Sequence, residues 1–177
     1  MDNSVKNYRI NIITENIFHN VKAFLQSTTS FRFILIITSA MFLTDICFNL
    51  LYIPFGDYDI KWFRFPDEDK SILMFIVAVT FAPLFETWLC QYLPYKLLCK
   101  SKFFRERKYL ILIASALFFG INHFYSLFYI IFGILMGTIL MYGYMVRIKS
   151  DKHTFLLIAI CHSLMNCGAF LLSRYFG

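Results

Sequence analysis

Five apolar segments, separated by charged stretches, constrain this chain more than any other feature. They are Phe33–Ile53, Ser71–Leu93, Tyr109–Asn122, Leu127–Val146 and Thr154–Ser173. A helix that crosses the hydrocarbon core of a bilayer needs about 20 consecutive apolar residues. Only 16% of the 177 residues are charged, against roughly 25% in soluble domains. The sequence therefore predicts an all-α, polytopic membrane bundle of about five transmembrane helices.

The third and fourth segments form one apolar stretch that is too long for a single span. It runs over 38 residues from Tyr109 to Val146, and one straight helix of that size would be about 57 Å long. That is nearly twice the hydrocarbon thickness, so the polar residues at 122–126 predict a tight turn. We expect the third helix to extend backwards through residues 103–104, where arginines can snorkel towards water. A re-entrant hairpin is the alternative.

All 17 basic residues and nine of the 11 acidic residues lie outside the apolar segments, and basic and acidic loops alternate along the chain. Basic residues dominate 1–32, 96–108 and 147–153, whereas loop 54–70 is mainly acidic. The positive-inside rule then predicts a cytoplasmic N-terminus and an extracytoplasmic C-terminus. We expect a multi-pass protein of the cell membrane that contacts membrane lipids. We expect no nucleic-acid partner, because the basic residues form no stripe on one element.

The chain divides into an N-terminal cytoplasmic or interfacial segment, 1–32, and one transmembrane domain, 33–177. Residues 10–25 carry apolar side chains at helical spacing opposite polar ones, which is typical of a helix on the inner membrane surface. A short packed helix before the first span explains the pattern equally well. Gly133-x-x-x-Gly137 allows close approach of helices, and we interpret it as an internal packing groove.

Two carboxylates, Asp45 and Glu86, lie inside apolar segments. A charge there costs several kcal/mol unless it is partnered or protonated. For Asp45 we favour a structural hydrogen bond between helices. Pro83 removes a helical hydrogen bond and is expected to bend the second span one turn before Glu86. Thr87 and Gln91 are four residues apart and share a face beside Glu86.

Two later spans carry polar pairs at the same spacing, Phe119 with His123 and His162 with Asn166. We expect the spans to direct these side chains at one interior point. There Glu86 can act as general base on a water molecule, while a histidine positions the water or shuttles its proton. The second histidine and the asparagine can donate hydrogen bonds to the oxyanion of a tetrahedral intermediate.

Zinc binding is the alternative for the same side chains. Two histidines and a carboxylate form a known catalytic zinc set, which here would be Glu86, His123 and His162. No His-Glu-x-x-His motif is present. We therefore expect peptide hydrolysis without a cofactor.

Together and in this order, the three segments resemble the CPBP family of intramembrane endopeptidases. These are the CAAX proteases and bacteriocin-processing enzymes, also called the Abi family. The family pattern is Glu-Glu-x-x-x-Arg, then Phe-x-x-x-His, then His-x-x-x-Asn or Asp, on successive core helices. Phe119/His123 and His162/Asn166 match the second and third motifs. The resemblance covers about residues 75–173 and implies a four-helix catalytic core at about 71–173.

The first motif departs from the family pattern at two positions. Glu86 aligns with the first glutamate, which the resemblance implies is the catalytic base. Thr87 stands at the second glutamate and Gln91 at the arginine. Both changes remove charge, so an ion pair becomes a neutral pair that can hydrogen-bond and no buried charge is stranded.

The resemblance implies an intramembrane endopeptidase that acts on a peptide or membrane protein, such as a prenylated protein or a leader peptide. It implies catalytic roles for Glu86, His123, His162 and Asn166. The changes at the first motif leave a second function open, that of a weak or inactive member acting as a bacteriocin-immunity or membrane binding protein. A proton-coupled transporter ranks last, because Asp45 alone could extend a polar path from Glu86.

Overall fold

The computed structural model describes residues 16, 19–52, 72–124 and 126–176, and within those ranges it contains helices and no strand. The all-α prediction is confirmed. After a helix at residues 19–27, the elements are α2 (Ser30–Tyr52), α3 (Ile72–Ile76), η3 (Val77–Phe81), α4 (Ala82–Thr87), η4 (Trp88–Tyr92), α5 (Leu93–Leu98), α6 (Lys102–Glu106), α7 (Lys108–Ile121), α8 (Leu127–Arg147) and α9 (Thr154–Phe176). Loop 54–70 and half of the amphipathic segment 10–25 lie outside the described residues.

Four helices within the described ranges are long and apolar enough to cross a membrane. They are Ser30–Leu51, Ile72–Leu98, Leu127–Arg147 and Thr154–Leu172. α7 is apolar but has only 14 residues, about 21 Å of helix. Its expected extension through residues 103–104 is wrong. The backbone leaves the helical region at Arg107 (φ −118°, ψ 62°), so α6 is a separate helix.

The chain reverses between α7 and α8 where the polar residues predict it. α7 ends at Ile121 and α8 begins at Leu127. Ser126 caps α8, because its hydroxyl oxygen accepts a hydrogen bond of 3.2 Å from the Tyr129 N–H. The single apolar stretch thus becomes two antiparallel helices.

Glycines allow α7 and α8 to pack closely. A Cβ atom on Gly133 would lie 2.9 Å from the Cα of Gly120, and one on Gly137 would lie 2.8 Å from the Cβ of Phe119. Both α8 glycines therefore face α7. The predicted internal packing groove is the surface on which these two helices meet.

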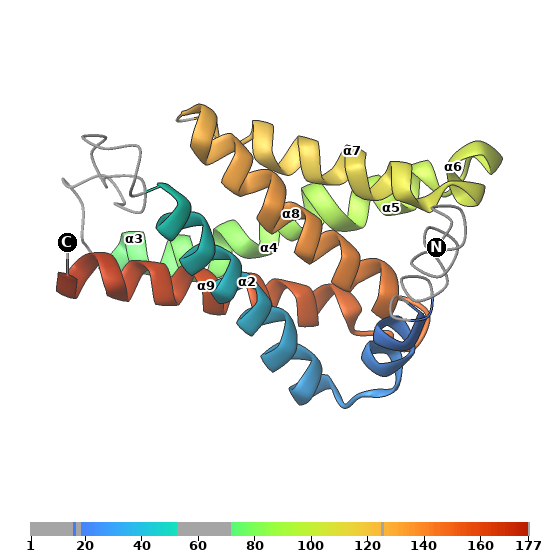
Figure 1. The fold of residues 1–177 in the computed structure, drawn as a ribbon, viewed down its shortest axis with the longest axis horizontal. Coiled ribbons are helices and arrows are strands. Elements are labelled where there is room, and N and C mark those ends of the chain that lie inside the picture. Colours follow the sequence, from blue (N-terminus) through green and yellow to red (C-terminus); the bar gives the residue numbers. More distant parts are fainter. Residues whose placement is uncertain (1–15, 17–18, 53–71, 125, 177) are drawn as a thin grey trace, which may run out of the picture.

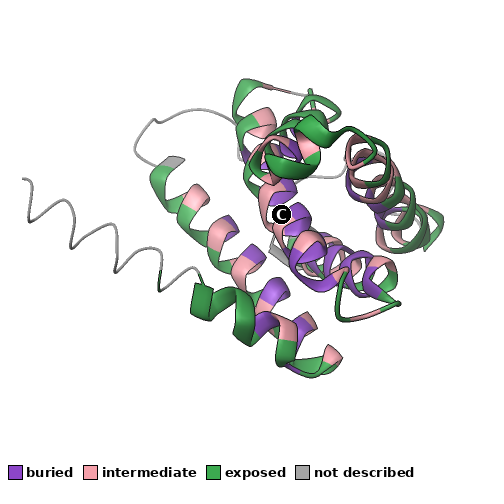
Figure 2. Cartoon of the chain, turned by 90° about the vertical axis from the view of Figure 1, so that its right-hand side faces the viewer, coloured by how far each residue is buried: buried purple, intermediate pink, exposed green. Residues whose placement is uncertain are grey.

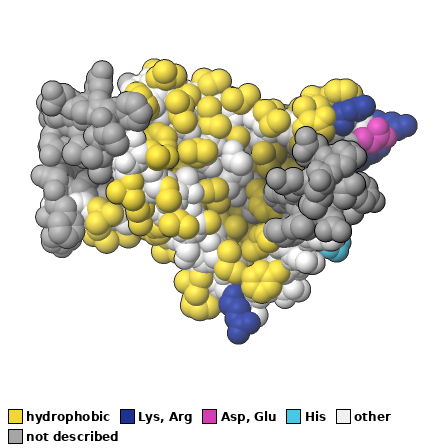
Figure 3. Space-filling model, in the orientation of Figure 1, with side chains coloured by type: hydrophobic (Ala, Val, Ile, Leu, Met, Phe, Trp, Pro, Cys, Tyr) yellow, Lys and Arg dark blue, Asp and Glu magenta, His cyan; other side chains and the backbone are white. Residues whose placement is uncertain are grey.

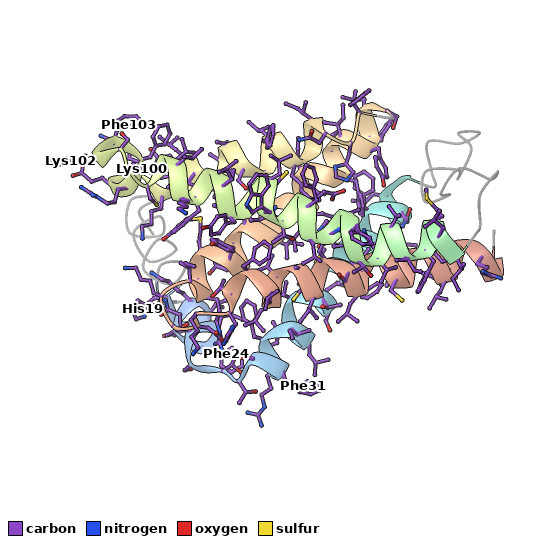
Figure 4. All side chains as sticks on the ribbon, turned by 180° about the vertical axis from the view of Figure 1, so that it is seen from behind. His19, Phe24, Phe31, Lys100, Lys102 and Phe103 are labelled. Carbon is purple, nitrogen blue, oxygen red and sulfur yellow. The ribbon has the colours of Figure 1, made fainter. Side chains whose placement is uncertain are left out.

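The long helices alternate in direction, so the described parts of the three basic stretches lie at one end of the bundle (Figure 1). The start of α2, the α5–α7 turn and the α8–α9 connection are found there. Figure 4 shows Lys100, Lys102 and Phe103 at the same end as His19 and Phe24. This arrangement is the one expected when the basic loops share one side of a membrane.

Apolar side chains cover the outside of the bundle as well as its core. Buried residues lie on the faces that the helices turn towards one another (Figure 2). Between the two ends, hydrophobic side chains dominate the face seen in Figure 3. Leu43, Leu51 and Phe81 are 62%, 71% and 64% exposed. Large exposed apolar surfaces mark contact with a membrane or a partner, and with four apolar spans they identify a membrane protein.

Arg147 joins the N-terminal helix to α8 at the basic end. Its buried guanidinium donates hydrogen bonds to the carbonyls of Leu25, Gln26 and Thr28 at 3.0, 3.1 and 2.8 Å. These carbonyls lie at the C-terminal end of helix 19–27. The last carbonyls of a helix have no donor within it, and a positive charge beside them is favourable. Asp151 lies 3.4 Å from Arg147 Nη2 and completes this anchor.

Substitution Asp151→Asn is expected to remove an acid-sensitive contribution to stability. Hydrogen bonds from the His153 N–H and the Ser30 hydroxyl, together with the Arg147 charge, hold the pKa of Asp151 below its ordinary 3.8. Because its pKa is lower in the folded state, ionised Asp151 stabilises the folded protein. This stabilisation is fully present above pH 3.8 and is lost as the pH falls through the folded-state pKa. In detergent, the thermal midpoint of the wild type should exceed that of Asp151→Asn at neutral pH, and the difference should disappear in acid. A gap that does not change with pH contradicts this prediction.

Substitution Gly133→Ala is expected to destabilise the bundle by roughly 1–3 kcal/mol, the usual cost of overpacking. The new Cβ would meet backbone, the Gly120 Cα at 2.9 Å. Gly143→Ala is the matched control, because its Cβ would meet the flexible end of Ile158 at 3.1 Å. Thermal unfolding should show the smaller loss for Gly143→Ala, and equal losses would argue against backbone contact as the cause.

Candidate functional site

Glu86 lies near the middle of the longest span, between two π-helical turns. η3 ends where the Ala82 N–H bonds to the Val77 carbonyl, five residues back, and η4 begins just after α4. Each π turn is followed by a proline, Pro83 or Pro94, which has no N–H to donate. A π turn, a feature found frequently at functional sites, thus precedes Pro83, the residue at which a bend is expected.

Neighbouring helices supply donors for two carbonyls of this irregular span. The Asn166 amide, on α9, donates to the Ala78 carbonyl at 2.9 Å, five residues before the first proline. The Ser115 hydroxyl, on α7, donates to the Cys90 carbonyl, four residues before the second. Such carbonyls would otherwise lack the donor that proline cannot provide, which is expensive in lipid. These two bonds hold the π turns on either side of Glu86.

Three helices bring the site side chains together: Glu86 lies on α4, His123 in the turn just after α7, and His162 on α9. Glu86 Oε2 lies 3.5 Å from His162 Nε2 and 3.9 Å from His123 Nε2. The side chains of Glu86, His123 and His162 are 27%, 19% and 5% exposed. Both distances exceed a direct hydrogen bond of about 2.7–3.2 Å. At such separations a water molecule can bridge polar groups.

Phe119 fixes the orientation of His123. The Nδ1 atom of His123 lies 2.7 Å from the Phe119 carbonyl. Because a carbonyl only accepts, Nδ1 carries the hydrogen, and Nε2 of the neutral ring is an acceptor that faces Glu86. The Phe119 ring packs against both histidines, with centroid distances of 4.6 Å to His123 and 5.5 Å to His162. The Phe-x-x-x-His spacing therefore acts through one backbone bond and ring packing.

The remaining predicted site residues are Asn166, Thr87 and Gln91. The Asn166 amide bonds to the backbone of η3, although its nitrogen carries a second hydrogen. Thr87 and Gln91 are fully buried. The Thr87 hydroxyl and both amide atoms of Gln91 make no hydrogen bond with any described residue. The direct bond that the neutral pair could form is therefore not made.

Among the described residues, the hydrogen bonds of Asp45 lie within α2 and not, as expected, between helices. Asn49 donates to the Asp45 carbonyl at 2.9 Å and to its carboxylate at 3.0 Å, both within α2. A side chain four residues away on the same helix face already provides the partner. Asp45 thus belongs to α2 and stands apart from the Glu86 contacts.

Metal-ligand geometry can be judged for the part of the chain that is described. There, no group of three or more His, Cys, Asp and Glu side chains is arranged to hold a metal ion. The set proposed for zinc, Glu86 with His123 and His162, is within that part. Its nitrogen–oxygen separations of 3.5 and 3.9 Å place the three side chains in one polar cluster.

Ser115 is a residue that sequence reasoning missed. It is fully buried on α7, four residues before Phe119 and eight before His123, so all three share one face. A hydroxyl on the motif-bearing face of an otherwise apolar helix was the available signal. Its partner, the Cys90 carbonyl, is on another helix and could not be found from spacing.

The profile of one protein family matches the chain. The family is described as type II CAAX prenyl endopeptidase Rce1-like, and the match covers residues 68–168. No curated protein and no solved structure matches the chain. The matched region contains the whole site, from η3 to His162 and Asn166. The chain therefore belongs to the Rce1-like family of CAAX prenyl endopeptidases, a family of proteases, in agreement with the CPBP motifs.

Substitution Ser115→Ala is expected to lower the free energy of unfolding by roughly 1–3 kcal/mol. The Cys90 carbonyl would lose its side-chain donor inside the bundle. Thr138→Ala is the matched control, because its hydroxyl bonds to the Ile134 carbonyl within the same regular helix at 2.7 Å. Chemical unfolding in detergent should show the larger loss for Ser115→Ala. The assignment of Ser115 as a support for η4 is wrong if the two variants unfold alike.

Proposed function

We propose that this protein is an intramembrane endopeptidase that hydrolyses a peptide bond with a water molecule activated by Glu86. The observation that carries the proposal is the approach of Glu86 Oε2 to Nε2 of both His123 and His162. A carboxylate and two imidazoles this close together can contact one water molecule at their edge, which suits general-base hydrolysis. Membership of a protease family supports the same reaction class.

In the proposed reaction, Glu86 and His123 orient the water. One hydrogen of the water points to the Glu86 carboxylate and the other to Nε2 of His123. That nitrogen accepts because its ring donates from Nδ1 to the Phe119 carbonyl. A lone pair of the water then remains for attack on the carbonyl carbon of the substrate, and Glu86 takes the proton.

The intermediate carries a negative oxygen that needs donors. His162 and the second amide hydrogen of Asn166 are the proposed donors, as in other oxyanion sites. Glu86 then returns its proton to the leaving amine, which restores the carboxylate. One water is consumed for each peptide bond, and no cofactor takes part. A zinc-dependent reaction at Glu86, His123 and His162 is the alternative to be tested.

The proposed substrate is a prenylated peptide or membrane protein, with a leader peptide as the alternative. The family to which the chain belongs is named for CAAX prenyl endopeptidases. On either side of Glu86, Phe85 and Trp88 are 59% and 43% exposed, and their rings lie 6.2 Å apart. They offer an apolar surface beside the carboxylate to a lipid-modified chain. The reaction would take place in the cell membrane, with the N-terminus in the cytoplasm.

Substitution Glu86→Gln is expected to lower cleavage of a farnesylated CAAX peptide in proteoliposomes by about 10²–10⁴-fold, because the general base is lost. Asp45→Asn is the matched control. It changes the other intramembrane carboxylate, which is bonded within α2, and should leave the rate near wild type. Cleavage by Glu86→Gln at the wild-type rate would falsify the assignment.

Two further arms separate the alternatives. The rate should not fall with a zinc chelator, and a chelator-dependent loss restored by zinc would support the metal site instead. The same peptide without its farnesyl group should be cleaved more slowly. If wild type and Glu86→Gln bind the farnesylated peptide equally and neither cleaves it, the protein is a binding member of the family. The neutral Thr87 and Gln91 are the observation that favours that second function.

A further inference from the structure

Thr87 and Gln91 form a buried polar pair directly beside the site. Both side chains are fully buried, and residues four apart are neighbours on a helix surface. η4 packs against α7 and α8, and α4 packs against α9. The pair therefore faces the interior of the bundle and is shielded from lipid.

These side chains have polar atoms that no described residue satisfies. The Thr87 hydroxyl and the Gln91 amide oxygen and nitrogen are buried without a hydrogen-bond partner. Glu86 Oε2 and His162 Nδ1 share this condition. Buried polar groups in proteins are nearly always hydrogen-bonded to protein or to ordered water. These five atoms belong to Glu86, Thr87, Gln91 and His162, and such buried polar atoms need a partner that the described side chains do not supply.

The chemistry of the pair points to water as that ligand. A threonine hydroxyl and a glutamine amide each offer both a donor and an acceptor. A bound cation would call for more oxygen ligands or carboxylates, and an anion would call for charged donors. Neither residue is charged, and water both donates and accepts. Buried waters make about three hydrogen bonds to otherwise unsatisfied polar groups.

We propose that Thr87 and Gln91 bind an internal water molecule next to Glu86. Hydrolysis consumes one water per cycle, and the surrounding lipid cannot supply that water. A water molecule bound by Thr87 and Gln91 stays within reach of the Glu86 carboxylate. The supply role rests on the proposed function, whereas the water site itself does not. Thr87 and Gln91 are thus positioning residues that act through water, in place of an ion pair.

The direct test uses the fact that the chain contains two glutamines, Gln26 and Gln91. Labelling glutamine side chains with a nitrogen isotope gives one amide signal for each in detergent micelles. Gln91→Met identifies the Gln91 signal by its loss. We expect a magnetisation transfer from water to the Gln91 amide. Gln26 donates to the Val146 carbonyl at 3.2 Å and serves as the reference signal. A visible Gln91 signal without water contact overturns the proposal.

Unfolding and turnover give independent tests. If the pair were dry, Gln91→Met and Thr87→Val would remove unsatisfied groups and raise the thermal midpoint. With water bound, the midpoint should stay level or fall, and a rise in both variants overturns the proposal. The kcat of Gln91→Met should fall about tenfold with KM unchanged, the loss expected for one hydrogen bond.

Thr44→Val is the matched control for the threonine change. Its hydroxyl bonds to the Ala40 carbonyl within α2 at 2.8 Å, so kcat should be unchanged. An unchanged kcat in Gln91→Met overturns the supply role. If wild type cleaves nothing, the proposed function fails, while the amide–water measurement still decides whether the water site exists.

Discussion

Backbone groups inside a membrane have no water to bond with, and this constraint governs the helix that carries Glu86. Two prolines interrupt that helix, and two π turns shift its hydrogen bonds to donors five residues later. Regular helices bring their own donors, whereas this one depends on its neighbours. Asn166 and Ser115 meet that need from α9 and α7. The irregular helix therefore depends on its packing against α7 and α9 around Glu86.

The same packing brings the two histidines to the acid. Gly133 allows α8 to approach the end of α7 so closely that its Cβ position lies 3.5 Å from the His123 Cβ. Phe119 then packs its ring against both imidazole rings and holds one of them by its carbonyl. A small residue, an aromatic ring and a backbone bond thus decide where a basic nitrogen points. The proposed reaction depends on these contacts, because together they place Nε2 of His123 near Glu86 Oε2.

Much of this could be predicted because it depends on neighbours in the sequence. Apolar length predicts the spans, and the polar residues at 122–126 predict the turn between α7 and α8. Four-residue spacing predicts that Phe119 and His123 share a face. The break at Arg107, where α7 starts, could not be predicted, because arginine is a good helix former and only its backbone angles show the break. The partner of Asp45 could not be predicted for a related reason, because a bond within one helix and a bond between helices satisfy the same carboxylate.

The sequence by itself determined the class of protein, a family-typical set of side chains and the helix that carries each. It could do so because hydrophobicity and helical period act over a few residues of one chain. Only the tertiary structure decided that Glu86 meets both histidines, that Asn166 and Ser115 serve carbonyls of another helix, and that Thr87 and Gln91 are buried without a protein partner. Those outcomes depend on how closely and at what depth separate helices pack, and no spacing along one helix contains that information.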